Sequence, residues 1–405
     1  MVEVLIAGAG PAGAIAALIL ARAGVRVLVV DRARFPRDKL CGDTLNPGSL
    51  AMLARHGIAD RILARGKPIE GMLITGAPDV RVRGVYGHNL TGRSITRREL
   101  DQHLIEAAVA AGARFQDGVR VASPIVDESA GVKAVRGLTL VANDRKPMRV
   151  PALVTIAADG RRSPIAFALG LAHHPASPRR WALGGYMTGV TGLDTVGEMH
   201  IRRGHYIGVA PLPDGLTNVC YVSPRPLIAS SRSSSPQSSS LQDDEKEEAA
   251  AASGADLGRA LLAHVRADPI LRDRFANATI AGPVTMLGPL AVDVPTAGMQ
   301  GLLLAGDAAG FVDPMTGDGL RFAIRGAELA AEVTQQCLEE PTFEGFRALT
   351  ARRAREFGVK YRFNRGLRGL VSSGAGVRAG TLGARVAPAV LRRIIRYAGD
   401  ESLAR

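Results

Sequence analysis

The chain has only three cysteines among its 405 residues, Cys41, Cys220 and Cys337. They are odd in number and far apart, so the sequence predicts neither a disulfide framework nor a metal site, and we expect a reducing, cytoplasmic environment. Aromatic residues make up 4% of the chain, which argues against platforms that stack single-stranded bases. No apolar run reaches the roughly 18 residues of a membrane span. We expect no leader segment, because a strand-like run begins at Val2.

Acidic residues are scarce mainly toward one end. Much of the net charge of +13 lies in residues 341–405, which contain 14 Lys and Arg against 4 Asp and Glu. We expect this basic region to be helical. Such a region suits nucleic acid, anionic lipid or an acidic substrate, or is a solvated helical face. We rank nucleic acid last and keep peripheral membrane contact as an expectation.

Residues 2–31 read as a strand over 4–7, a glycine turn, a helix and a second strand over 25–30. Gly8, Gly10 and Gly13 have the G-x-G-x-x-G spacing, which gives a tight turn, close backbone approach to a pyrophosphate and close helix packing. The helix begins at Pro11 and Ala12, and the free N–H groups of its N-terminus point at the phosphates. Asp31 ends the second strand, where a carboxylate can accept from ribose hydroxyls. This stretch predicts a dinucleotide site.

A long loop follows Asp31. It is rich in Pro, Gly and Asp, and we expect no helix or strand before Ser49. Ordered loops of this length are usually functional. Gly42 and Gly48 would let backbone approach a flat ligand, and Cys41 is either beside a redox centre or an ordinary buried thiol.

Residues 94–111 predict an amphipathic helix whose start is marked by the capping box Thr96–Glu99. Arg97 opposes the helix dipole in the first turn. It therefore has an anionic partner such as a phosphate, or it is a plain exposed arginine.

Further along, a buried strand ends at Asp159 and Gly160, where parallel sheets bind ligands. Residues 180–290 become β-like and suggest an inserted sheet that roofs the cofactor. In that sheet His205 and Tyr206 either face a substrate or are structural. The serine-rich and acidic stretch 229–253 is expected to be disordered.

Nucleotide-site chemistry returns at residues 301–319. A strand over 302–305 leads to Gly306 and Asp307, and a loop over 314–319 feeds a helix over 320–337. The positive end of that helix can stabilise negative charge on a reduced flavin. A second acid-and-glycine site this far along the chain indicates a ligand as long as FAD.

With these motifs in place, the chain resembles FAD-dependent oxidoreductases of the para-hydroxybenzoate hydroxylase superfamily, and within it the geranylgeranyl reductase family. The resemblance runs from residue 1 to about residue 370. The matching pieces are Gly8–Gly13, Phe35–Gly42, Ile95–Asp101, Ala158–Gly160 with Ser163, and Gly306–Gly319. The family often continues the cysteine motif with a glycine pair or Gly-Asp-Gly, whereas this chain has Gly42-Asp43-Thr44.

The resemblance implies an α/β fold, with a Rossmann-like three-layer FAD-binding domain, an inserted antiparallel β-sheet substrate domain and a helical C-terminus. The predicted ranges are 1–75, 92–178 and 290–340 for the first, 76–91 and 179–289 for the second, and 341–405 for the third. By resemblance, Arg97 and Asp307 contact the FAD phosphates and ribityl region, Gly317 and Gly319 approach the isoalloxazine edge, and Asp159 and Gly160 brace the site. The full predicted cofactor set is Gly8, Gly10, Pro11, Ala12, Gly13, Asp31, Arg32, Cys41, Gly42, Arg97, Asp159, Gly160, Gly306, Asp307, Gly317 and Gly319.

The implied function is an FAD-dependent reductase that saturates carbon–carbon double bonds of an isoprenoid or other lipid-like substrate, with NAD(P)H as electron donor. The alternative is an NAD(P)H-dependent flavin monooxygenase that hydroxylates an aromatic or polyketide substrate. Both use the same FAD motifs, so the motifs do not separate them. A basic flavoprotein associated with nucleic acid is the third hypothesis. The sequence assigns no catalytic acid or base.

Overall fold

The computed structural model describes residues 2–76, 80–87, 90–128, 131, 133–142, 146–227, 254–340 and 342–403. The stretch 229–253, which we predicted to be disordered, lies outside these residues. Within the described ranges, none of the helices combines the length and the apolar character that crossing a membrane requires.

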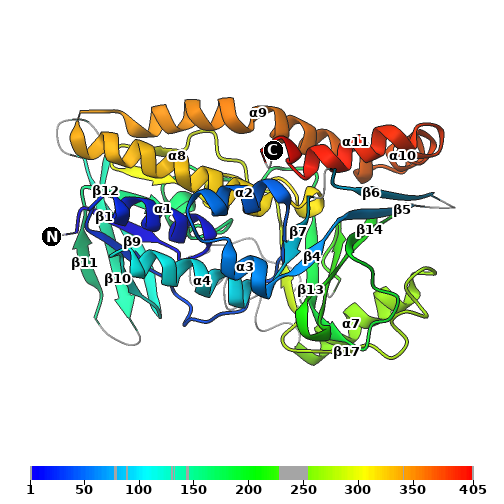
Figure 1. The fold of residues 1–405 in the computed structure, drawn as a ribbon. Coiled ribbons are helices and arrows are strands. Elements are labelled where there is room, and N and C mark those ends of the chain that lie inside the picture. Colours follow the sequence, from blue (N-terminus) through cyan, green and yellow to red (C-terminus); the bar gives the residue numbers. More distant parts are fainter. Residues whose placement is uncertain are drawn as a thin grey trace, which may run out of the picture.

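A six-stranded sheet forms the centre of the nucleotide-type domain (Figure 1). Its inner strands pair in parallel and are buried throughout, as strands covered on both faces should be. The predicted strands at 4–7 and within 25–30 and 302–305 are confirmed. In spatial order the strands are β19 (Gly298–Met299), β20 (Leu302–Leu304), β12 (Val154–Ala157), β1 (Val4–Ala7), β2 (Val27–Val30) and β8 (Arg114–Gln116).

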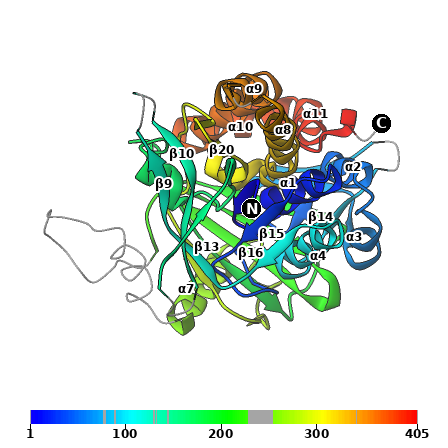
Figure 2. The same cartoon turned by 90° about the vertical axis from the view of Figure 1, so that its left-hand side faces the viewer.

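This sheet is the middle of three layers, as predicted (Figure 2). Helices α1 (Pro11–Arg22), α4 (Arg97–Ala110) and α8 (Gly319–Glu339) pack on one face. An antiparallel sheet covers the other face together with the short helix α5 (Pro164–Ala168). The strands of that covering sheet are β9 (Val119–Asp127), β10 (Ala134–Ala142) and β11 (Met148–Pro151).

An eight-stranded sheet, almost wholly antiparallel, forms the second unit. Helix α7 (Gly254–Ala267) covers one of its faces, and the loop before α8 and the end of the helix that spans 345–372 contribute to an apolar cluster on the other. The sheet includes Gly71–Gly76, so its first strand begins within the range 1–75 that we predicted for the FAD-binding domain. Its strands are β5 (Gly71–Gly76), β6 (Val80–Val85), β13 (Trp181–Thr188), β14 (Val196–Arg202), β15 (His205–Pro211), β16 (Thr217–Ser223), β17 (Thr279–Ile280) and β18 (Thr285–Leu287).

Our expectation of no regular structure before Ser49 is wrong. A small sheet of β3 (Thr44–Leu45), β7 (Gly92–Ser94) and β4 (Lys67–Ile69) begins earlier, and α2 (Pro47–Arg55) follows it. The side chain of Asn46 caps α2 by accepting from the Ser49 amide at 2.8 Å. Pro47 occupies the first helical position, where its fixed backbone angle is favourable. A short helix α3 (Asp60–Arg65) comes next.

The C-terminal region is helical, as predicted. Helix α9 (Gly345–Ser372) runs along α8 and continues toward the eight-stranded sheet (Figure 1). There α10 (Gly374–Val386) and α11 (Pro388–Ala398) lie beside β5 and β6. The C-terminal helices thus bridge both units.

Candidate FAD and substrate site

The glycine turn after β1 is shaped by contacts that leave no room for side chains. A Cβ on Gly8, where φ is +96°, would lie 2.4 Å from the Ala158 carbonyl oxygen, and a Cβ on Gly13 would lie 1.8 Å from the Gly8 oxygen. Gly10 differs, because its nearest neighbours are guanidinium nitrogens of Arg37 at 3.5 Å and Arg97 at 3.8 Å from the Cβ position. The turn therefore faces two cations, as a pyrophosphate site would.

Arg97 is held in a buried ion-pair cluster. Thr96 caps α4 as predicted, and the Arg97 side chain is 4% exposed, so the exposed-arginine alternative is wrong. Its Nε and Nη2 donate to the two carboxylate oxygens of Asp101 at 2.7 Å each, and Nη2 of Arg37 lies 2.9 Å from the same carboxylate. Burial lowers the pKa of Arg97, but the negative charge of Asp101 outweighs it and the pKa is raised. Asp101 thus fixes two guanidinium groups beside Gly10.

Asp31 is buried at the end of β2, where it braces the glycine turn. One carboxylate oxygen accepts from the Ala9 amide at 2.8 Å and the other from the Ala33 amide at 2.9 Å. Its neighbour Arg32 is exposed. Asp31 therefore orders the glycine turn and the start of the loop, and its contact with a ribose stays a prediction.

Lys39 enters the same space from the long loop. Its Nζ lies 3.7 Å from the position of a Cβ on Gly160. Burial and the charge of Arg97 lower the pKa of Lys39, while Asp307 acts in the opposite direction. Electrostatics thus couples Lys39 to two predicted site residues. Arg37 and Lys39 were not among our predicted site residues; their place in the matching loop was the signal.

Asp159 presents an unsatisfied carboxylate at the end of β12. Both of its oxygens are buried without a hydrogen-bond partner in the described part of the chain, and burial raises its pKa to about 7. Next to α1, a Cβ on Gly306 would lie 2.8 Å from the Ala12 Cβ. An orphaned acceptor among cations and close-packed backbone fits a long ligand that brings both hydroxyl donors and phosphates.

The cysteine loop meets the eight-stranded sheet at Asp43. Nδ2 of Asn218 on β16 donates to the Cys41 carbonyl and to Oδ2 of Asp43, each at 2.7 Å. Asp43 has a left-handed backbone (φ +52°), and its Oδ1 is buried without a partner among the described residues. Burial raises the pKa of Asp43 to about 7, although Tyr186 and Asn218 favour the charged form. Cys41 is half-buried and Gly42 exposed.

The loop before α8 is tied to the same sheet. The hydroxyl of Tyr206 donates to Oδ1 of Asp313 at 2.7 Å, and Nη1 of Arg180 lies 3.2 Å from Oδ2. His205 instead stacks on Tyr221 with ring centroids 4.9 Å apart. Tyr206 therefore points to the side of the sheet on which the loop before α8 lies, and His205 points to the opposite side.

In the same loop, Gly317 has a positive φ of +69°. A Cβ at Gly317 or at Gly319 would meet open space. That open space is consistent with the flat ring placed there by resemblance.

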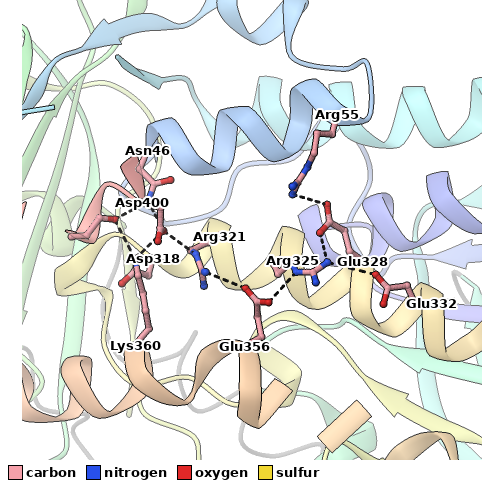
Figure 3. Close-up of polar contacts among 11 residues, drawn as sticks. Asn46, Arg55, Asp318, Arg321, Arg325, Glu328, Glu332, Glu356, Lys360 and Asp400 are labelled. Atoms are coloured by element: carbon pink, nitrogen blue, oxygen red, sulfur yellow. Dashed lines mark hydrogen bonds and ion pairs between the residues drawn. The ribbon is translucent and has the colours of Figure 1, made fainter. Parts of the chain in front are cut away.

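A charged network joins the start of α8 to the C-terminal helices (Figure 3). Nζ of Lys360 lies 2.7 Å from Asp318 and 2.8 Å from Asp400, and all three groups are buried. Arg321 pairs with Asp400 at 2.9 Å. A Cβ on Gly48 would lie 2.4 Å from the Asp400 Cβ. Gly48 therefore makes room for the C-terminal segment, and our expectation that it makes room for a flat ligand is wrong.

Residues 1–335 match the FAD binding domain family. The chain belongs to this family. It is 30% identical over 344 residues to the menaquinone reductase of Mycobacterium tuberculosis (strain CDC 1551 / Oshkosh), covering 82% of this chain and 76% of that protein. It is 28% identical over 344 residues to digeranylgeranylglycerophospholipid reductase 2 of Methanopyrus kandleri, covering 84% and 78%.

Solved structures share the fold of this FAD-binding protein. A geranylgeranyl bacteriochlorophyll reductase-like protein from Thermoplasma acidophilum superposes with a TM-score of 0.73 at 21% identity, over 98% of this chain and 91% of that one. The myxobacterial chondrochloren halogenase superposes with a TM-score of 0.74 at 21% identity, over 100% and 96%. The resemblance and the α/β flavoprotein fold are confirmed, and the protein is an FAD-dependent oxidoreductase.

Proposed function

We propose that this flavoenzyme reduces carbon–carbon double bonds of an isoprenoid or other lipid-like substrate and receives its electrons from NAD(P)H. The observation that carries the proposal is the buried carboxyl of Asp43, at the junction of the cysteine loop and the substrate sheet. An apolar cluster lies on the adjoining sheet face, and partly buried side chains that include Leu40, Met72 and Cys220 pack against it. Reductases of isoprenoid lipid and of menaquinone among the relatives support the same substrate class.

FAD would be held by Arg37 and Arg97 beside Gly10, by Asp307 and by Asp159. Bound and reduced, it supplies a hydride equivalent. Saturation of a double bond also requires one proton on the second carbon. Burial raises the pKa of Asp43 to about 7, so a substantial fraction of this carboxyl carries a proton near neutral pH. Its Oδ1 has no hydrogen-bond partner among the described residues and would deliver that proton.

Tyr186 is the group placed to assist Asp43. Burial, followed by the charge of Asp43, raises the pKa of the Tyr186 phenol, so it stays protonated. Asn218 fixes the carboxylate by holding Oδ2. In this arrangement Asn218 orients, Asp43 donates, and Tyr186 retains a proton beside the carboxylate.

The test is an anaerobic turnover experiment. The FAD-loaded protein, reduced stoichiometrically, is mixed with a polyprenyl quinone or a geranylgeranyl lipid in detergent, and flavin absorbance and product mass are followed. We expect reoxidation of the flavin together with a product that has one double bond fewer. If the flavin stays reduced until oxygen is admitted, and a parallel sample with an aromatic or polyketide substrate and oxygen gives a hydroxylated product, the monooxygenase is favoured instead. NADH and NADPH are compared as reductants in the same cell.

A further inference from the structure

Helices α10 and α11 present large apolar side chains to the outside of the molecule. Leu382 and Val386 lie one helical turn apart on α10 and are 63% and 77% exposed. Val390, in the first turn of α11, is 56% exposed. Among the side chains described on α10, none is buried. We call the outward side of α10 and α11 the α10–α11 face.

The side of α10 that faces α9 carries glycines, whereas Leu382 and Val386 are exposed on the outside. A Cβ on Gly376 would lie 2.0 Å from the carbonyl oxygen of Leu370 on α9, and a Cβ on Gly380 would lie 3.4 Å from Cδ2 of Leu370. A helix that covers a core normally buries its large apolar stripe. Helix α10 does the opposite, so its apolar stripe has no internal partner in the described structure and suits an external one.

The charge of the same segment is of one sign. Residues 373–399 contain no Asp or Glu, and their basic residues are Arg378, Arg385, Arg392, Arg393 and Arg396. Helix α11 is fixed in place because Ile395 packs on Gly84 of β6, where a Cβ would lie 2.5 Å from the Ile395 side chain. Arg392, Arg393 and Arg396 remain exposed around this anchor.

We propose that the α10–α11 face docks on the surface of an anionic phospholipid bilayer. Apolar side chains ringed by arginines are the composition of helices that lie in the membrane interface, and each basic residue near an anionic surface adds to the attraction. A second copy of this chain is disfavoured as the occupant, because two such faces would oppose arginines to arginines. The face also adjoins the apolar cluster on the eight-stranded sheet. Val371, at the end of α9, belongs to that cluster together with Met199 and Met315.

The test uses the FAD-loaded full chain and needs neither substrate nor reductant, so its outcome is independent of the proposed function. Binding is measured by flotation with vesicles of phosphatidylcholine alone and of phosphatidylcholine with phosphatidylglycerol. We expect binding to the anionic vesicles, weakened by salt. The L382S/V386S variant should lose most of the bound fraction, and R392Q/R393Q should bind weaker by on the order of tenfold.

Matched changes elsewhere serve as controls. Met148 on β11 is 57% exposed, and M148S removes an apolar side chain far along the chain from the α10–α11 face. R120Q/R149Q removes two exposed arginines from β9 and β11. Both controls should bind as the parent does, and bound FAD reports that each variant is folded. Absence of binding to anionic vesicles overturns the proposal, as does a parent dimer that L382S/V386S converts to a monomer without any vesicle binding.

Discussion

The hydroxyl of Tyr206 donates a hydrogen bond of 2.7 Å to the carboxylate of Asp313. Tyr206 lies on β15 of the eight-stranded sheet, and Asp313 lies in the loop that opens α8. Asp313 also accepts from the Met315 amide at 3.1 Å. One carboxylate therefore fixes the backbone of the loop and its distance from the sheet, and so links the two units.

Y206F tests this link. Asp313 keeps Arg180 but loses a hydrogen bond to a charged acceptor, so we expect a loss of about 2 kcal/mol in the free energy of unfolding and weaker FAD binding. Both are measured by urea unfolding and by titration of apoprotein with FAD. Y221F is the control on the neighbouring strand, because the contacts of Tyr221 with His205 and His264 are made by its ring, which phenylalanine retains. Equal losses in both variants would contradict the assignment.

R97Q tests the phosphate side of the site. Removing one of two guanidinium groups beside Gly10 should weaken FAD binding by at least about tenfold, since a charged hydrogen bond is worth about 1.5–3 kcal/mol. The readout is the quenching of FAD fluorescence. R98Q is the matched control on the same helix: Arg98 is exposed and pairs with Asp38, itself exposed, at 3.3 Å. An R97Q variant with parental FAD affinity would refute the role.

The raised pKa of Asp43 leads us to expect that turnover and stability both depend on pH. Turnover should fall as pH rises through about 7, because the donor loses its proton, and D43N should lower turnover and flatten that limb. D38N, an exposed change in the same loop, should keep the profile. A parental pH profile in D43N would rule Asp43 out as the donor.

The sign for stability follows from the same group. The folded pKa of about 7 lies above the unfolded value of about 3.9, so the folded state binds more protons between these values. The contribution of Asp43 to stability is full below pH 4 and is lost as pH rises toward 7. Urea unfolding at pH 5 and pH 8 should therefore show D43N gaining stability relative to the parent at the higher pH.

K360M tests the network of Figure 3. It leaves Asp318 and Asp400 buried without their shared cation, and removal of one partner from a buried ion pair costs about 3–5 kcal/mol. We expect a lower melting temperature and, because Asp318 precedes α8, a shifted flavin absorbance spectrum. R355M, at an exposed position of the same helix, should change neither. An unchanged flavin spectrum in K360M would show that the network does not influence the loop before α8.

Local signals in the sequence predicted much of the fold of the nucleotide-type domain. The spacing of Gly8, Gly10 and Gly13, the capping box at Thr96 and the buried runs that became β1, β12 and β20 each depend on neighbours in the chain. Asp43 was visible only as a departure from the family pattern. Its meaning depends on Asn218 and Tyr186, which come from strands far along the chain and reach it only in the fold.

The contacts of Lys360 were equally hidden. An arginine-rich helix is compatible with solvent on every side, and nothing local marks Lys360 as one of the buried cations of α9. The pairing with Asp318 and Asp400 exists because α9 lies along α8. In the same way, the start of α2 was missed, since Pro, Gly and Asp in the preceding loop outweighed the Asn46–Pro47 cap signal.

The side chain of Asn46 donates to the Ala398 carbonyl at 2.9 Å, across 352 residues of chain. During synthesis residue 46 leaves the ribosome long before residue 398 is added to the chain. Until then the start of α2 lacks its hydrogen bond to the Ala398 carbonyl. Nascent chains should therefore pass through a state in which the glycine turn is formed but the second helix is incompletely docked. A chaperone that binds incompletely folded proteins could bind this state. Ribosome-bound chains arrested at increasing lengths should show protease protection of α2 appearing last.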